Sequence, residues 1–224
     1  MKTKTLLIAA AALAATVISS EAQVYSQNVV GYVNVVVPQS PGWACVANPF
    51  DVDGVNNITN VLASAPKGAT IQLWTASGFS VVVTRNAFSG AWSPSAATTF
   101  IPPGVGFMIK GATAFTNTFV GSVVAPAPGT NSLPLSSSVL QLVGSPIPFA
   151  GGLTGVGDNG TNALNLGDAL PKGSQIQTWN NGFALAATKN AFSGVWSANP
   201  TISVGQGFFV KPGSATNWVQ TLVP

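Results

Sequence analysis

The residues best suited to recognise a ligand lie in a short segment that occurs twice. The sequence Asn-Ala-Phe-Ser-Gly-x-Trp-Ser occupies residues 86–93 and again 190–197, and a cation precedes each copy. An indole face can stack on a sugar ring, while amide and cationic groups beside it can bind hydroxyls. Two copies would also bind with avidity. The residues of this carbohydrate-binding hypothesis are Arg85, Asn86, Trp92, Lys189, Asn190 and Trp196. In the alternative interpretation, the Phe and Trp of each copy point into a core and Ser-Gly forms a turn.

Acidic and amide side chains in two other stretches could offer oxygen ligands to a calcium ion. Asp51 and Asp53 belong to the first stretch, and Asp158 belongs to the second. Calcium takes about six to eight oxygen ligands, and neither stretch supplies enough carboxylates for a built calcium loop. The alternative is that these side chains accept hydrogen bonds from nearby backbone N–H groups in Asx turns. We expect no metal ion and no other cofactor.

Catalytic chemistry is limited by the side chains that the sequence lacks. It contains no histidine, its only glutamate is Glu21, and its only cysteine is Cys45. A Ser-His-Asp triad, a Cys-His pair and His- or Cys-rich metal sites therefore cannot form within one chain. Ser64 and Lys67 have the spacing of an acylating Ser-x-x-Lys motif, and residues 155–160 spell Gly-x-Gly-x-x-Gly, but both motifs lack their companion elements. We predict that the protein is not an enzyme. Cys45 is either a buried apolar side chain or half of an intermolecular disulfide.

The charged side chains are few and isolated. They make up 6% of the chain, whereas about 25% is typical of globular domains. Nucleic-acid binding needs clustered cations, so we exclude it. Protection of strand edges is the simplest role for single cations that recur in both copies of a repeat. The recurring pairs are Lys67 with Lys172, Arg85 with Lys189, and Lys110 with Lys211.

The N-terminal residues have the pattern of a secretory signal peptide. Lys2 and Lys4 precede an apolar stretch over residues 6–18, and small residues suit cleavage before residue 23. We therefore expect residues 1–22 to be a signal peptide. The protein is expected to be exported to the periplasm, the cell surface or the exterior. No second long apolar segment follows, so no membrane span is expected after removal of the signal.

A tandem repeat sets the expected domain organisation. Residues 66–93 and 171–197 align with one gap and are identical at 16 of 27 positions. A stretch rich in Pro and Gly over residues 125–131 separates the two copies. We predict one β-repeat unit over residues 23–125 and a second over residues 126–224.

Alternating runs rich in β-branched and aromatic residues dominate both copies. Such runs predict strands, and the Gly and Pro turns between them are typical of sandwiches and small barrels. We predict an all-β protein of two homologous β-sandwich or barrel-like units, each with at most a short helix. One helix is expected just before Pro66. Trp74, Trp179 and the Trp of each repeated segment are expected to anchor the two cores.

Three further motifs resemble those of exported bacterial β-domains. They are Gly-Trp followed by Asn-Pro over residues 42–49, Ile-Gln-Leu-Trp at 71–74, and Pro-Gly-Val-Gly-Phe at 103–107. The mature chain resembles uncharacterised exported tandem β-repeat proteins of Gram-negative bacteria. This resemblance implies secretion and an all-β fold, and it implies no activity, ligand or catalytic residue.

Two functions stay open on the sequence alone. The first is a non-enzymatic exported protein with a structural or surface-interaction role in the cell envelope or extracellular matrix. Low charge, tandem β-units and missing catalytic groups favour it. The second is a carbohydrate-binding module that uses the repeated Trp-containing sites. The corresponding partners are another envelope protein or a polysaccharide, and the exposure of Trp92 and Trp196 discriminates between the two.

Overall fold

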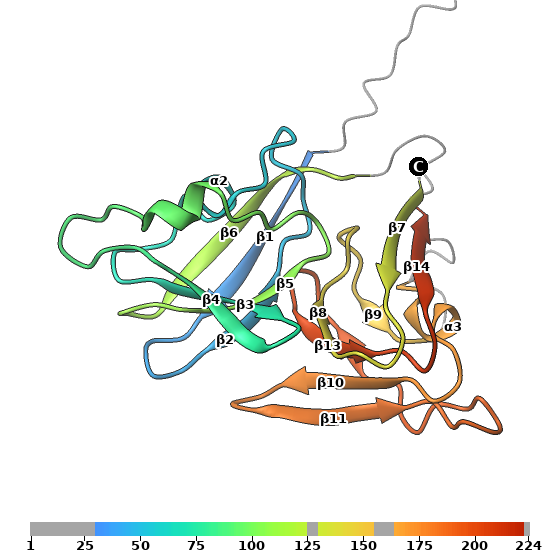
Figure 1. Cartoon of the computed structure of the whole chain (residues 1–224). Coiled ribbons are helices and arrows are strands. Elements are labelled where there is room, and N and C mark those ends of the chain that lie inside the picture. Colours follow the sequence, from blue (N-terminus) through green and yellow to red (C-terminus); the bar gives the residue numbers. More distant parts are fainter. Residues whose placement is uncertain (1–29, 125–129, 155–163, 222–224) are drawn as a thin grey trace, which may run out of the picture.

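The computed structural model describes residues 30–124, 130–154 and 164–221, which are coloured along the chain in Figure 1. These residues form antiparallel strands with three short helical turns, α2 (Ile58–Val61), η1 (Pro94–Ala97) and α3 (Leu166–Ala169). The prediction of an all-β protein is confirmed. The predicted signal peptide, the predicted boundary between the units and the Gly-x-Gly-x-x-Gly motif lie outside the described residues.

The first half of the chain, called unit 1 below, combines a four-stranded sheet with a two-stranded ribbon. In the ribbon, β1 (Val30–Val37) pairs with β6 (Phe115–Ser122). Inward side chains of both ribbon strands pack with the sheet and α2 around one core. The sheet has the order β2-β5-β3-β4, formed by β2 (Ala44–Ala47), β5 (Gly106–Lys110), β3 (Thr70–Thr75) and β4 (Gly78–Thr84).

The second half, called unit 2 below, repeats this arrangement strand for strand. Its four-stranded sheet has the equivalent order, formed by β8 (Gln141–Val143), β13 (Phe208–Lys211), β10 (Gln175–Trp179) and β11 (Phe183–Thr188). The ribbon of unit 2 pairs β7 (Thr130–Leu135) with β14 (Thr216–Thr221). Unit 2 adds a short pair, β9 (Gly151–Gly152) and β12 (Thr201–Ile202). Neither four-stranded sheet closes on itself, so the barrel-like alternative is wrong for the described residues.

Each unit has its own buried core with an equivalent aromatic pair. Phe107 and Phe119 meet edge to face in unit 1, with ring centroids 6.4 Å apart. Phe208 and Trp218 take the same places in unit 2, at 6.0 Å. The indole N–H of Trp218 donates to the Leu164 carbonyl at 2.7 Å, so this polar edge is satisfied inside the core.

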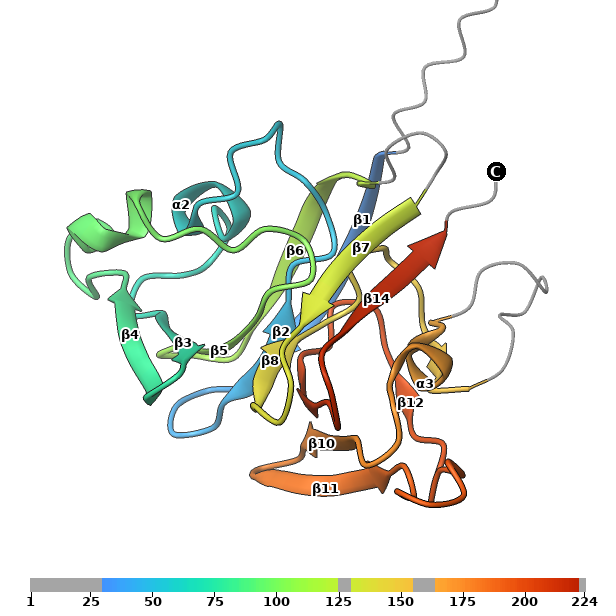
Figure 2. The same ribbon diagram turned by 45° about the vertical axis from the view of Figure 1, so that its right-hand side comes forward.

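The two units join through a reciprocal backbone contact. Val46 in β2 bridges to Gln206 of unit 2, and Val143 in β8 bridges to Val105 of unit 1. Because Val46 is the repeat equivalent of Val143, and Val105 that of Gln206, the two contacts are related by approximate two-fold symmetry. The hydrogen bonds beside them run from Ala47 N–H to the Gly205 carbonyl, at 2.9 Å, and from Gly144 N–H to the Gly104 carbonyl, at 3.0 Å. Figures 1 and 2 show β2 and β8 close together at the centre of the molecule.

An apolar cluster formed by both units fills the space between the sheets. Its buried members are Cys45 and Met108 from unit 1 and their equivalents Leu142 and Phe209 from unit 2. Burial of side chains from both units favours association in the same way as burial in a core. The units therefore pack against each other over an apolar interface.

Two indole groups complete this interface by reciprocal hydrogen bonds. Trp74 Nε1 donates to the Leu140 carbonyl of unit 2 at 2.8 Å. Trp179 Nε1 donates to the Trp43 carbonyl of unit 1, also at 2.8 Å. Trp74 and Trp179 pack against the cluster between the units, so the expectation that they anchor the core of each unit is wrong.

Candidate functional site

The repeated segment of unit 1 forms a braced loop directly after β4. The side-chain oxygen of Asn86 accepts hydrogen bonds from the backbone N–H groups of Phe88 and Ser89, at 2.8 and 2.9 Å. Gly90 follows with a φ of +76°, a conformation that favours glycine. Its N–H donates to the Asn86 carbonyl at 2.9 Å. The Asn and Gly of the repeated segment therefore build the loop.

Unit 2 repeats this loop after β11 with the same bonds. The side-chain oxygen of Asn190 accepts from the N–H groups of Phe192 and Ser193, both at 2.8 Å. Gly194 again has a φ of +76°, and its N–H donates to the Asn190 carbonyl at 2.9 Å. Asn86 and Asn190 were predicted to bind ligand, but their side-chain oxygens serve the loops themselves.

The tip of each loop presents a phenylalanine to solvent. Phe88 is 90% exposed and Phe192 is 91% exposed, so the interpretation that these rings point inward is wrong. The Phe88 carbonyl accepts from Lys67 Nζ at 2.8 Å, and the Phe192 carbonyl accepts from Lys172 Nζ at 2.6 Å. The main chain at each tip is therefore held at both its N–H and its C=O. These two residues were missed as candidates, although an Asn two positions earlier is a signal for a turn tip.

The two loops lie far from each other. In Figure 1 the chain after β4 runs to the left end of the molecule, whereas the chain after β11 runs to the lower right end. Figure 2 shows the same separation from a second direction. The two loops therefore lie at opposite ends of the protein.

The cation before each segment satisfies backbone carbonyls next to a helical turn. Arg85 donates from Nε to the Gly90 carbonyl at 3.0 Å, and its guanidinium also donates to the Ala65 carbonyl. Lys189 Nζ donates to the carbonyls of Gly167 and Leu170, at 2.8 and 2.7 Å. These contacts stabilise the fold and differ from the strand-edge protection that was expected of the cations.

Each of these cations also lies over the tryptophan of its own segment. The Arg85 guanidinium carbon is 5.6 Å from the ring centroid of Trp92, and Lys189 Nζ is 5.7 Å from that of Trp196. Both indoles are half-buried and pack against the core of their unit. The structure thus brings each predicted cation and Trp together, but neither indole is the fully exposed platform of a shallow sugar site.

Unit 2 has an open cleft beside its tryptophan. The cleft has a volume of about 430 Å³, and Trp196, Lys189, Asp168, Thr154 and Asn199 are among the residues that line it. Asp168 is exposed, and it forms no ion pair or side-chain hydrogen bond with the described part of the chain. The cleft thus combines an aromatic ring, a cation and an available carboxylate.

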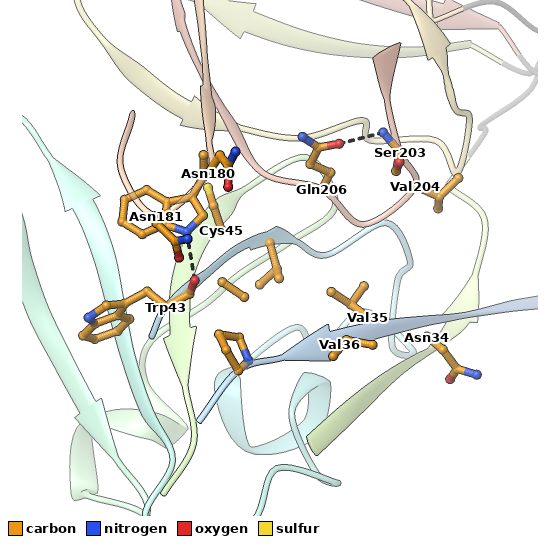
Figure 3. Close-up of a pocket in the computed structure, with 14 residues that line it drawn as sticks. Asn34, Val35, Val36, Trp43, Cys45, Asn180, Asn181, Ser203, Val204 and Gln206 are labelled. Atoms are coloured by element: carbon orange, nitrogen blue, oxygen red, sulfur yellow. Dashed lines mark hydrogen bonds between the residues drawn. The ribbon is translucent and has the colours of Figure 1, made fainter. Parts of the chain in front are cut away.

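A second hollow, of about 440 Å³, lies between the two units (Figure 3). Asn180 and Asn181, from the turn between β10 and β11, lie on the side opposite Val35 and Val36 of β1 in this view. The Gln206 side chain at its rim accepts the Ser203 N–H at 2.9 Å. The described residues that line it carry no charge.

The calcium candidates do not form a metal site in the described residues. Asp51 accepts from Gly54 N–H at 2.8 Å with one carboxylate oxygen and from the Asn56 amide with the other. Asp53 is exposed and has a φ of +49°, and Asp158 lies outside the described residues. Across the described ranges, no group of three or more His, Cys, Asp or Glu side chains could hold a metal ion.

Cys45 is a free thiol buried between the two units. The structure agrees with the first of the two interpretations of Cys45, a buried apolar side chain. Burial raises the pKa of the Cys45 thiol far above its ordinary value, because the thiolate would lose its hydration. The thiolate form that reacts with disulfides and electrophiles is therefore suppressed.

The described residues thus form an all-β fold with two similar units, a Phe-tipped loop in each unit and, in unit 2, a cleft lined by a carboxylate. No protein-family model matches the chain, and no curated protein or solved structure is significantly similar to it. In the part of the chain that the structure describes, no helix has the length and apolar character needed to cross a membrane.

Proposed function

We propose that this protein is a non-enzymatic exported protein with a surface-interaction role in the cell envelope or extracellular matrix. Export rests on the signal-peptide pattern of residues 1–22. The observation behind the interaction role is the exposure of Phe88 and Phe192, about nine-tenths of each ring, on loops with the same bracing. A ring exposed to this degree contributes little to folding, whereas an aromatic anchor inserted into a partner's pocket often dominates a binding interface.

The bracing of the loops supports a role in binding. The N–H and C=O groups of Phe88 are both engaged, by Asn86 and by Lys67, and the corresponding bonds hold Phe192. A loop that is ordered before binding loses less conformational entropy when it enters a complex. Each loop therefore presents a preorganised aromatic anchor, and the partner we favour is an envelope protein with an apolar pocket.

The positions of the loops support a connecting role. Because the loops after β4 and β11 lie at opposite ends of the molecule, the tips are placed to engage two partners or two sites of one assembly (Figures 1 and 2). Two linked sites can raise the overall affinity about 10²–10⁴-fold above that of one site. A protein with this geometry would link envelope or matrix components.

Co-sedimentation with isolated bacterial cell envelopes tests the proposal. We expect Phe88→Ser and Phe192→Ser each to weaken binding at least about 100-fold through loss of avidity, and the double variant to reduce it to background. Leu185→Ser is the matched control, because Leu185 is also an exposed apolar residue, at 58%, but lies within β11. Circular dichroism checks that all variants fold. Wild-type binding by the folded double variant would contradict the proposal.

Carbohydrate binding is the second candidate function, and one observation favours it. Trp196 lines an open cleft together with a cation and an exposed carboxylate. The carbohydrate hypothesis included two equivalent sites, at Trp92 and Trp196. The cleft supports a site at Trp196.

A further inference from the structure

We infer that the cleft beside Trp196 is a binding site for a neutral saccharide and that this site belongs to unit 2 alone. The inference rests on the second candidate function, carbohydrate binding, and does not depend on the exposed rings of Phe88 and Phe192. The cleft volume of about 430 Å³ falls within the range of about 300–1,000 Å³ common for small-molecule sites. Its lining supplies the three kinds of group that such a ligand needs.

Asp168 supplies the hydrogen-bond acceptor. It lies in the first turn of α3, lines the cleft, and has no side-chain partner among the described residues. An ionised carboxylate accepts hydrogen bonds through two oxygens, which suits a pair of neighbouring hydroxyl groups on one sugar ring.

Lys189 supplies a donor with a fixed position. An ammonium group has three N–H donors, and two of those of Lys189 are used by the carbonyls of Gly167 and Leu170. One donor is left for a ligand on the cleft side, where Lys189 is a lining residue. Because one anion and one cation line the same cleft, their charges balance and a neutral hydroxylated ligand suits it better than an ionised one.

The half-buried ring of Trp196 supplies the apolar surface. The non-polar face of a pyranose ring packs on aromatic side chains, and Trp offers the largest such area. Trp196 Nε1 donates to the Gly167 carbonyl at 3.2 Å, so the indole is tied to the residue directly before Asp168. The ring and the backbone that carries Asp168 are therefore held in a fixed relation.

The other wall of the cleft is held by hydrogen bonds of its own. Thr154 N–H donates to the side-chain oxygen of Asn199 at 3.0 Å, and the Asn199 amide donates back to the Thr154 carbonyl at 3.2 Å. The pairing of β9 with β12 holds the flanking chain segments together. Both walls are thus preorganised, which lowers the entropic cost of binding.

Unit 1 lacks the group on which this site depends. Asp168 lies three residues before Pro171, and the residue in the same place before Pro66 is Ala63. Arg85 takes the place of Lys189 and directs its guanidinium to backbone carbonyls. Although the repeated segments are nearly identical, the carboxylate that would bind hydroxyls is present in unit 2 only.

Titration of the isotope-labelled protein with cellopentaose and with chitopentaose tests the inference. The readout is the indole N–H resonance of Trp196, assigned by its absence in Trp196→Phe. We expect one of the two oligosaccharides to shift this resonance saturably, while the Trp92 resonance stays unchanged. Asp168→Asn should weaken binding at least about tenfold, because hydrogen bonds to a charged group are lost.

Two control variants make the outcome specific. Asp53→Asn removes the same charge at an exposed position in unit 1 where Asn tolerates the positive φ, and it should bind as the wild type does. The double variant Phe88→Ser, Phe192→Ser should also bind normally, so failure of the loop proposal and failure of this one are distinguishable. The inference is overturned if neither oligosaccharide shifts the Trp196 resonance at up to about 10 mM, if both indoles shift alike, or if Asp168→Asn has no effect.

Discussion

Replacement of Trp179 by Phe tests whether the reciprocal indole contacts stabilise the pairing of the units. Phenylalanine keeps an aromatic ring near Phe183, whose centroid lies 4.8 Å from that of Trp179, but it removes the N–H that donates to the Trp43 carbonyl at 2.8 Å. One hydrogen bond contributes about 0.5–1.5 kcal/mol, and a partly buried carbonyl left without its donor adds to the loss. The phenyl ring also has a smaller contact area than the indole. Both losses together should lower the free energy of unfolding by about 1.5–2.5 kcal/mol.

The approximate two-fold symmetry predicts the same loss at the other end of the interface. Trp74→Phe removes a hydrogen bond of the same length, to the Leu140 carbonyl. Its cost should equal that of Trp179→Phe within about 0.5 kcal/mol, and the two costs should add in the double variant if the contacts are independent. Equilibrium unfolding in urea, followed by far-ultraviolet circular dichroism, measures all three without relying on tryptophan fluorescence.

Trp43→Phe is the matched control for this series. It changes the same type of side chain at the same interface, but the main-chain carbonyl that accepts from Trp179 remains. The substitution weakens the contact of Lys110 Nζ with the Trp43 ring, at 4.6 Å, which is worth about 0.5–1 kcal/mol. It also reduces the contact of this ring with the cluster between the units, as Trp74→Phe and Trp179→Phe do for their rings. If Trp74→Phe and Trp179→Phe cost no more than this control, the indole hydrogen bonds do not stabilise the pairing. Two separate unfolding transitions in the wild type would refute energetic coupling of the units.

Three further substitutions examine the loops, the interface and the thiol. Asn190→Ala removes the acceptor for two backbone N–H groups of the unit 2 loop and should lower the free energy of unfolding by about 1–2 kcal/mol in the same urea assay. Gly207→Ala places a Cβ 2.7 Å from the Val46 carbonyl oxygen and should cost more than about 2 kcal/mol, whereas Gly182→Ala, with open space around it, should stay within about 0.5 kcal/mol. Because burial raises the pKa of Cys45 in the folded state, the thiol of the unfolded chain ionises at lower pH than that of the folded protein. Above about pH 8.5 the free energy of unfolding of the wild type should therefore fall, relative to that of Cys45→Ala, by up to about 1.4 kcal/mol per pH unit. A constant difference between these two proteins from pH 7 to 10 would contradict this.

The fold class followed from the sequence because it depends on local signals. Alternating apolar residues and turn residues define strands wherever they occur, and the structure has strands in most of the predicted runs. The roles of Trp74 and Trp179 could not be predicted in the same way. Repeat identity states that two residues occupy equivalent positions, but not whether each contacts its own unit or the other one.

The second glycine of the Pro-Gly-x-Gly-Phe motif also has a role that depends on contacts between the units. Gly104 and Gly205 have φ values of +88° and +76°, which a turn signal in the sequence anticipates. Gly106 and Gly207 are required for a different reason, since an added Cβ would lie 2.9 Å from Val143 N and 2.7 Å from the Val46 carbonyl oxygen, respectively. These contacts cross between units, so only the assembled structure explains the second glycine.

The sequence predicted part of the candidate site, but it did not predict the roles of those residues. The sequence pointed to the repeated segment, and the structure brings its cation and Trp together. Aromatic residues of β-proteins are usually buried, and this favoured a place for Phe88 in the core. The Asx turn at Asn86 instead places Phe88 at the tip of an exposed loop. Asp168 was not among the candidate residues, because its place beside Trp196 depends on the packing of α3 against the loop.

The two units differ in which of their residues packing explains. Paired residues at the interface, such as Met108 and Phe209, are explained by the reciprocal packing that both units need. Phe88 and Phe192 are also paired, yet their rings contact solvent, so packing gives no reason for an aromatic residue at both tips. Asp168 departs from the pairing and lies in an open cleft. Exposed aromatic residues at equivalent positions of both units therefore point to a function that both units perform. A carboxylate that lines a cleft in unit 2 and has no equivalent in unit 1 points to a function of unit 2 alone.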